Sequence, residues 1–110
     1  MAGGTTVAVS DATFKADVLD SSEPVVVDFF ADWCGPCKAM APALEQVAAE
    51  LKGKVKVVKL DVDQNPDVTQ RYRIQAMPTL MIFKNGEVAA QRVGALVHKK
   101  QLLDWVNGSI

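Results

Sequence analysis

The segment Trp33-Cys34-Gly35-Pro36-Cys37 contains both cysteines of the 110-residue chain, three positions apart. Such a pair can be a structural crosslink, part of a metal site or a reactive dithiol. Residues i and i+3 at the start of a helix have Cα atoms about 5–6 Å apart, within the range that a disulfide tolerates. The bond can therefore form and open with little backbone movement, which is what a redox-active dithiol needs.

The other two interpretations explain less. A tetrahedral zinc site takes four Cys or His ligands, and the chain has two cysteines and the single histidine His98, so a metal site would have to be shared between chains. We expect His98 on the surface, at the start of a helix. A crosslink that closes a four-residue loop stabilises by only about 2 kcal/mol on the chain-entropy model. The spacing therefore favours the redox interpretation.

The two cysteines are predicted to differ in reactivity. Cys34 falls at a helix N-terminus, where free N–H groups and the helix dipole favour a thiolate. Cys37 lies one turn inside the helix, and we expect it to be more buried and less ionised. Cys34 would then attack a substrate disulfide and Cys37 would resolve the mixed disulfide. Pro36 stiffens the first turn without removing a hydrogen bond from the helix.

A buried strand and an amphipathic helix are predicted to position this pair. The segment 25–31 is apolar on both faces except at Asp28, a pattern typical of a central strand. From Cys34 onward the apolar residues follow a helical period up to Gly53, where the helix is expected to end. Pro42 lies inside that helix and should kink it. The apolar stripe of the helix comprises Met40, Leu44, Val47 and Leu51.

The remaining patterns predict a mixed α/β sheet. Ser10 is expected to cap a helix over 11–20, in which Phe14 and Val18 share one face. Asn85-Gly86 is a strong hairpin signal. The other expected elements are strands 5–9, 54–62, 79–83 and 87–93, a short helix over 65–72 and a last helix over 97–107. We therefore expect one domain over 1–110, with a central mixed five-stranded sheet flanked by four helices on its two faces.

Composition excludes several classes of function. Hydrophobic residues make up 49% of the chain, and the net charge of -1 comes without a basic run, so we expect no nucleic-acid partner. No segment approaches the roughly 18 apolar residues of a membrane span. Residues 1–14 lack the charged and apolar regions of a signal peptide. We expect a soluble protein of the reducing cytoplasm, where a transient disulfide is functional.

These residues together resemble the bacterial-type thioredoxins over essentially the whole chain. The shared motifs are Trp33-Cys34-Gly35-Pro36-Cys37-Lys38, Asp28 in the preceding strand, Lys59 in the next strand and Met77-Pro78-Thr79. The resemblance implies the thioredoxin fold and a protein disulfide reductase. The chain departs from the commonest family pattern at Phe30, where Trp is frequent, and at Ala76, where Gly or Ser is frequent.

The resemblance also implies roles for residues around the dithiol. Asp28 would lie beneath Cys37 and accept its proton, with Lys59 close by; a structural ion pair between Asp28 and Lys59 is the alternative. Pro78 would be cis and face the dithiol, leaving the Met77 backbone free to pair with an extended substrate strand. Gly94 is either an ordinary turn glycine or part of a shallow apolar client surface with Trp33, Gly35 and Pro36.

The implied activity needs partners but no bound cofactor or metal. Electrons would come from NADPH through thioredoxin reductase, and clients by analogy are ribonucleotide reductase, methionine sulfoxide reductases and peroxiredoxins. The chain would act as a monomer. Two rivals are an oxidase or isomerase of the same fold, which would more often carry His between the cysteines, and a binding module whose cysteines are incidental.

Overall fold

The computed structural model of the protein describes residues 6–110. The strands are β1 (Thr6–Ala8), β2 (Val25–Phe30), β3 (Lys56–Asp61), β4 (Thr79–Lys84) and β5 (Glu87–Val93); the helices are η1 (Lys15–Leu19), α1 (Gly35–Glu50), α2 (Pro66–Arg71) and α3 (Lys99–Ser109). The predicted order of strands and helices is confirmed. Of the strand expected over 5–9, Thr5 lies outside the described residues.

The five strands form one mixed sheet in the order β1-β3-β2-β4-β5. β2 pairs in parallel with β3 and antiparallel with β4, so it is the central strand. Its residues from Val25 to Phe29 are all buried, because both faces of the sheet are covered at this strand. The segment is therefore apolar on both faces for the predicted reason, because it is a central strand that is covered on both sides.

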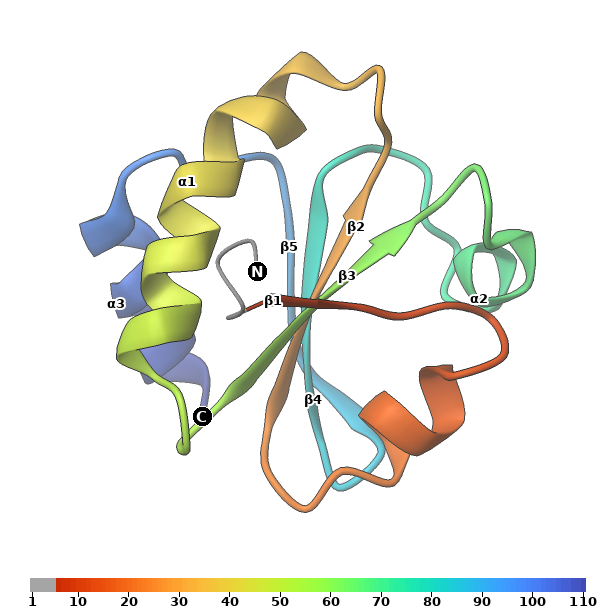
Figure 1. The fold of residues 1–110 in the computed structure, drawn as a ribbon, viewed down its shortest axis with the longest axis horizontal. Helices are drawn as coiled ribbons and strands as arrows, with labels where there is room; N and C mark the ends of the chain where they lie inside the picture. Colours follow the sequence, from red (N-terminus) through yellow and green to blue (C-terminus); the bar gives the residue numbers. More distant parts are fainter. Residues whose placement is uncertain (1–5) are drawn as a thin grey trace.

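Helices cover both faces of the sheet (Figure 1). α1 and α3 lie on one face, where Met40, Leu44 and Val47 of the predicted stripe pack into the core with Leu102 and Val106 of α3. η1 and α2 lie on the other face, where the apolar side chains come from η1, α2 and the alternate positions of the strands. This second core includes Phe14, Val18, Phe29, Val68 and Phe83.

The first helix differs from the prediction. The segment Lys15–Leu19 is a π-helix, and a hydrogen bond runs from the Asp20 N–H to the Lys15 carbonyl at 2.9 Å. The Ser10 hydroxyl does not cap it; the Ser10 carbonyl instead accepts from the Phe14 N–H at 2.9 Å. Phe14 and Val18 are both buried, as their spacing predicts. The apolar spacing therefore predicted which side chains are buried but not the type of helix.

The turns agree with the sequence-based predictions more closely than the first helix does. Asn85 and Gly86 have φ angles of 55° and 82°, as the Asn-Gly hairpin signal predicts for the β4–β5 connection. α1 ends at Glu50, and Gly53, with φ of 88°, lies in the turn that follows the helix. α3 starts at Lys99, two residues later than expected, with the exposed His98 at its N-cap. Among residues 6–110, no helix is both long and apolar enough to cross a membrane.

Candidate active site

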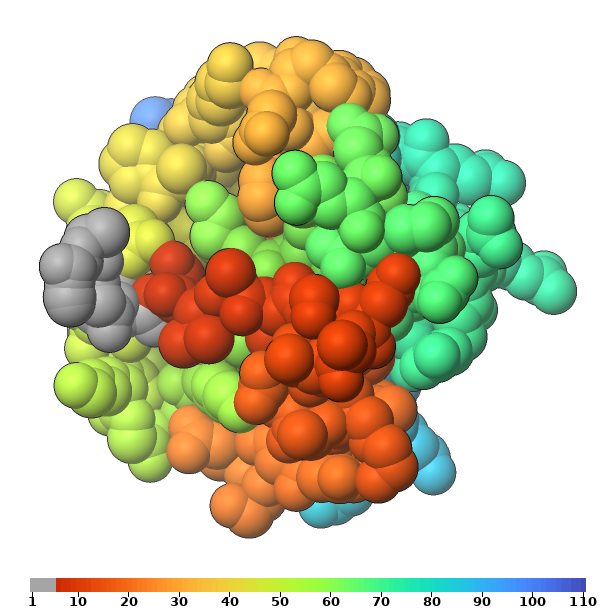
Figure 2. All heavy atoms as spheres, turned by 45° about the vertical axis from the view of Figure 1, so that its right-hand side comes forward, coloured from red at the N-terminus to blue at the C-terminus, as the bar shows by residue number. Residues whose placement is uncertain are grey.

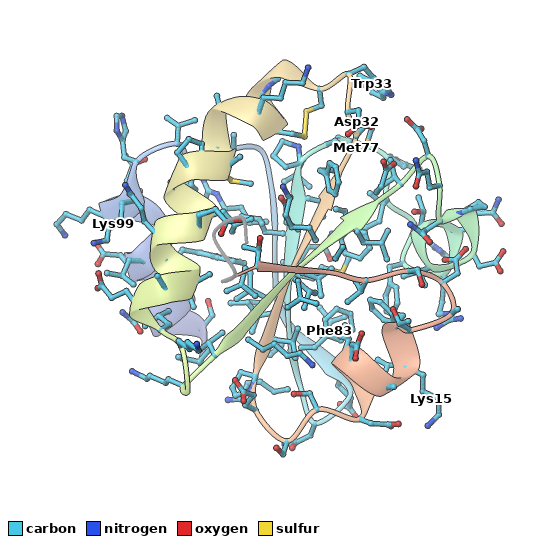
Figure 3. The ribbon with its side chains drawn as sticks, in the orientation of Figure 1. Lys15, Asp32, Trp33, Met77, Phe83 and Lys99 are labelled. Carbon is cyan, nitrogen blue, oxygen red and sulfur yellow. A yellow bond between two sulfur atoms is a disulfide. The ribbon has the colours of Figure 1, made fainter. Side chains whose placement is uncertain are left out.

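Cys34 and Cys37 form a disulfide at the N-terminal end of α1 (Figure 3). Their Cα atoms are 5.3 Å apart, within the predicted range. Cys34 is the N-cap of α1, and its Sγ accepts a hydrogen bond from the Cys37 backbone N–H at 3.1 Å. A sulfur in this position meets a free helix N–H group and the positive end of the helix dipole. Both favour a thiolate at Cys34 once the disulfide is reduced.

The predicted difference in burial between the two cysteines is wrong for the disulfide form. Cys34 is 4% exposed and Cys37 is 5% exposed. The Met77 carbonyl oxygen lies 3.6 Å from Cys34 Sγ and helps to cover it. The two sulfurs differ instead in their polar surroundings, because the helix N–H points at Cys34 while Cys37 borders a cavity with a carboxyl group.

The segment before β4 forms one side of the site. The Met77–Pro78 peptide bond is cis, as the family resemblance implies. Pro78 is buried and Met77 is half-buried. The Pro78 carbonyl accepts a hydrogen bond from the Gly94 N–H at 2.9 Å, so the end of β5 is bound to the cis segment. Gly94 has φ of 104°, a conformation that favours glycine.

The surface around the disulfide carries exposed apolar groups. Trp33 is 68% exposed, and its indole N–H donates to the Asp63 carboxylate at 2.8 Å. In Figure 2 the light-orange residues at the top, which precede and begin α1, lie beside the green residues after β3, consistent with that contact. Val93 and Val97, on either side of Gly94, are also exposed. Sequence reasoning missed Asp63 and the two valines, because a strand pattern does not tell which edge residues stay uncovered.

Asp28 is a carboxyl group inside the central strand. It is 2% exposed, and within the described part of the chain its Oδ1 has no hydrogen-bond partner. Burial raises the pKa of Asp28 from its ordinary value of 3.8 to about 7, and the positive charge of Lys59 opposes this rise. The Asp28 carboxyl can therefore exchange a proton near neutral pH.

A cavity of about 120 Å³ lies between β2 and the start of α1. Its lining includes Asp28, Cys37 and Lys59, and also the exposed residues Asp32 and Lys38. Water occupies about 30 Å³ per molecule in the liquid, so the space is large enough for a chain of waters. The structure thus brings Asp28 and Cys37 to one cavity, as the resemblance implies.

Lys59 is the neighbour of Asp28 on β3, but the two do not form an ion pair. Their Cα atoms are register partners in the parallel β2–β3 ladder. No ion pair in the described part of the chain includes Asp28, and the Lys59 ammonium lies 4.8 Å from the centroid of the Phe30 ring. The structure therefore shows no direct Asp28–Lys59 ion pair, and the Phe30 contact is a feature that sequence reasoning missed.

Comparison with known proteins identifies the family. The thioredoxin family model matches residues 5–108. The chain is 51% identical to a thioredoxin of Rickettsia felis, over 93% of this chain and 96% of that protein. It is 51% identical to a thioredoxin of Rhodospirillum rubrum, over 93% of this chain and 97% of the relative. Identity to a thioredoxin of Pseudomonas aeruginosa is 49%, over 93% and 94% of the two chains.

The geometry of the Cys34–Cys37 pair agrees with the family relationship. Thioredoxins carry no bound cofactor, and they work with a reductase and with disulfide-containing client proteins. Among residues 6–110, no group of three or more His, Cys, Asp or Glu side chains is arranged to hold a metal ion. The chain therefore belongs to the thioredoxin family, and it is a thiol–disulfide oxidoreductase with a Cys34–Cys37 redox pair.

Proposed function

We propose that this thioredoxin reduces protein disulfides, with Cys34 as the attacking thiolate and Cys37 as the resolving thiol. The observation that carries the proposal is the Cys37 N–H···Sγ contact to Cys34 at 3.1 Å, at the N-cap of α1. A backbone donor and a helix N-terminus stabilise negative charge on that sulfur in particular. Among residues 6–110 no hydrogen-bond donor contacts the Cys37 sulfur, and Cys37 lines the same cavity as the Asp28 carboxyl group.

The two steps conserve atoms and electrons. The Cys34 thiolate attacks one sulfur of a client disulfide, forms a Cys34–client disulfide and releases the other client sulfur as a thiolate, which takes a proton from water. Cys37 then loses its proton and attacks Cys34 Sγ. The bond between Cys34 and the client breaks, and the second client sulfur leaves as a thiolate. The client gains two electrons, and Cys34 and Cys37 end as the disulfide.

Asp28 is proposed as the acceptor of the Cys37 proton, directly or through water in the shared cavity. A general base works best when its pKa is near the working pH, and burial raises the pKa of Asp28 to about 7. Lys59, the register partner of Asp28, would tune that basicity through its positive charge. The proton then passes to solvent or to the departing client thiolate.

An extended client segment is proposed to lie across the surface around the disulfide. The Met77 backbone borders Cys34 Sγ, and Pro78 brings no N–H donor to the sulfurs. Exposed apolar groups beside the disulfide would contact the apolar side chains of an unfolded client. The proposed binding residues are Trp33, Gly35, Pro36, Met77, Pro78 and Gly94.

The remaining features of the function follow from the family. We propose that electrons reach the dithiol from NADPH through thioredoxin reductase. Clients by analogy are ribonucleotide reductase, methionine sulfoxide reductases and peroxiredoxins. We also propose that residues 1–110 form one domain and that the protein acts as a monomer in the cytoplasm, where a reducing environment returns the disulfide to the dithiol.

Cysteine variants test the assignment of roles in an insulin-disulfide reduction assay with dithiothreitol. The Cys34→Ser variant should lose turnover and form no mixed disulfide. The Cys37→Ser variant should also lose turnover but accumulate a mixed disulfide with insulin, visible on a non-reducing gel. A mixed disulfide that accumulates in Cys34→Ser, or that fails to accumulate in Cys37→Ser, contradicts the assignment, and retained turnover in both variants would make the chain a binding module with incidental cysteines.

The reduction potential separates a reductase from an oxidase of the same fold. Equilibration of the Cys34–Cys37 pair with glutathione buffers gives the potential directly. A value near that of other thioredoxins, about -270 mV, supports a reductase. A value near -120 mV, in the range of a strong oxidant, would overturn it.

A further inference from the structure

The Lys59 ammonium has two possible interaction partners, the aromatic ring of Phe30 and the carboxyl group of Asp28. Asp28 and Phe30 are two residues apart on β2, and both line a cavity that Lys59 also borders. Lys59 is the register partner of Asp28 on the adjacent strand. Its ammonium nevertheless lies over Phe30, 4.8 Å from the ring centroid, and not in an ion pair with Asp28.

The ring can compete for the ammonium because Lys59 and Phe30 are both half-buried. A cation over an aromatic face is attracted to the negative face of the ring, and the attraction grows as both groups lose water. Lys59 and Phe30 line the cavity beside Asp28, and they also line a larger cavity of about 480 Å³ toward Ser10 and Asn65. Lys59 therefore borders both cavities, and its ammonium contacts the ring that they share.

Without the ring, Asp28 is the buried carboxyl group that borders a cavity shared with Lys59. Asp61 also lines the larger cavity, but its Oδ1 already accepts from the backbone N–H groups of Asp63 and Gln64, at 2.9 and 3.4 Å. The Oδ1 atom of Asp28 is buried and has no partner in the described part of the chain. The other charged groups at the Asp28 cavity, Asp32 and Lys38, are exposed.

We propose that Phe30 is a positioning residue, whose ring holds the Lys59 ammonium away from the Asp28 carboxylate and so preserves the basicity that Asp28 needs as a proton acceptor. A direct ion pair would stabilise the carboxylate and make it a weaker base. The raised pKa of Asp28 agrees with a lysine that acts only from a distance. The catalytic value of this arrangement rests on the proposed role of Asp28 in the reductase reaction.

The test is the pKa of Asp28 in the oxidised protein, followed by carboxyl carbon NMR between pH 4 and pH 9. The oxidised form is chosen because its cysteines do not titrate. In the Phe30→Leu variant the ammonium moves to Asp28, and the pKa of Asp28 should fall by about 1 or more. An unchanged or raised pKa overturns the proposal. Phe30→Met, which also lacks a ring, serves in the same way if the leucine variant does not fold.

Two controls distinguish the effect of losing the aromatic ring on the pKa of Asp28 from the effect of general repacking around residue 30. Phe30→Trp keeps an aromatic face, so the pKa of Asp28 should remain near its wild-type value; a fall like that in Phe30→Leu overturns the proposal. Lys59→Met removes the ammonium. In that background Phe30→Leu should leave the pKa of Asp28 unchanged, and a fall equal to that in the wild-type background means that the effect does not pass through Lys59.

The proposal and the role of Asp28 in the reaction can fail independently. The titrations report where the Lys59 ammonium lies, and they need no client and no turnover. If Asp28→Asn leaves the resolving step unchanged while the Phe30 and Lys59 variants behave as expected, Asp28 is not the base but Phe30 still positions Lys59. If the titrations fail while Asp28→Asn slows resolution, Asp28 is the base and Phe30 does not tune it.

Discussion

Asp28 and Cys37 line one cavity of about 120 Å³, although they lie on different elements, the central strand β2 and the helix α1. An isolated charge inside a strand that is otherwise apolar destabilises the fold. In the proposed mechanism this carboxyl group accepts the proton that Cys37 loses when it resolves a mixed disulfide. The cavity that the two residues share would be the route of that proton.

Replacement of Asp28 should affect the second chemical step more than the first. In Asp28→Asn the amide cannot accept the Cys37 proton, so resolution of the mixed disulfide should slow on the order of 100-fold at neutral pH. Attack by Cys34 should change little, because its thiolate is stabilised by the helix N-terminus. Rapid-mixing kinetics with a disulfide substrate resolve the two steps.

Asp32→Asn is the matched control for that experiment. Asp32 lines the same cavity but is exposed, so neither step should change in this variant. In the wild-type protein the rate of resolution should rise with pH through about 7, the pKa of Asp28. Unchanged resolution in Asp28→Asn would remove Asp28 from the mechanism.

The same carboxyl group should make the protein less stable as the pH rises. The Asp28 carboxyl ionises near 3.8 in the unfolded chain but near 7 in the folded protein. Between these values the unfolded chain binds fewer protons, so the free energy of unfolding falls as pH rises and levels off above about 7. Asp28→Asn lacks this effect. Urea unfolding should show wild type losing about 3 kcal/mol relative to the variant between pH 5 and pH 8.

Comparison with the variant cancels the contributions of all other carboxyl groups. If the stability of Asp28→Asn follows the same pH dependence as wild type, burial does not raise the pKa of Asp28. A gain of stability by wild type over the variant between pH 5 and pH 8 would likewise contradict the raised value, since it would mean that the folded state favours the ionised carboxyl.

Asp11 should stabilise α2 from a distant part of the chain. Its carboxylate accepts from the backbone N–H groups of Asp67 and Val68, at 3.2 and 2.9 Å. Asp11→Ala leaves these donors at the start of α2 without their partner and should lower the free energy of unfolding by about 1–2 kcal/mol. Asp20→Ala, which breaks only the exposed ion pair to Lys15, should change it by about 0.5 kcal/mol or less. Equal losses in urea unfolding would contradict the capping role.

Trp33 should report the redox state of its neighbour Cys34. Disulfides quench excited indoles that lie close to them, so the Trp33 emission should rise when the Cys34–Cys37 bond is reduced. Trp105→Phe leaves Trp33 as the single tryptophan of the chain and gives a clean signal. Identical emission spectra for the oxidised and reduced forms would show that the indole, which is turned toward Asp63, lies too far from the disulfide.

Gly94 should matter more for protein clients than for small disulfides. Its φ of 104° is strained for any residue with a Cβ, although a Cβ there would meet no atom within 4 Å. Gly94→Ala should therefore lower the free energy of unfolding by about 1–2 kcal/mol. It should also shift the Pro78 carbonyl that accepts the Gly94 N–H, and so reduce insulin turnover more than turnover of a small disulfide.

Gly108→Ala controls for the added methyl group. Gly108 lies inside α3, where alanine is favoured over glycine by about 0.5–1 kcal/mol. This variant should be slightly more stable than wild type and fully active. Equal loss of activity toward insulin and the small disulfide in Gly94→Ala would remove Gly94 from the client surface.

Local sequence patterns predicted several strands, helices and turns of this protein. The apolar run of β2, the stripe of α1 and the Asn85-Gly86 turn each depend on residues close together in the sequence, and all three are confirmed. The Cys-Gly-Pro-Cys spacing likewise predicted a disulfide with unstrained Cα separation. These features follow from backbone geometry and from the burial of one face of each element.

Other features required contacts between distant segments. Asp11 caps a helix 56 residues away, Trp33 bonds to Asp63, and the Met77 carbonyl covers Cys34. The apolar spacing of η1 also did not predict its π-helical form. No local pattern encodes these contacts, because the fold alone decides which segments meet.

Asp28 and Lys59 show most clearly what the sequence determined and what only the tertiary structure decided. Their sequence context was enough to place a carboxyl group and an amine on adjacent strands next to the dithiol. Whether the two would pair depended on a third side chain, Phe30, and on a cavity whose shape comes from the packing of α1 against β2. Sequence determined which charges meet at the site, and tertiary packing decided how far apart they stay, since an ammonium settles at the most favourable of the partners within its reach.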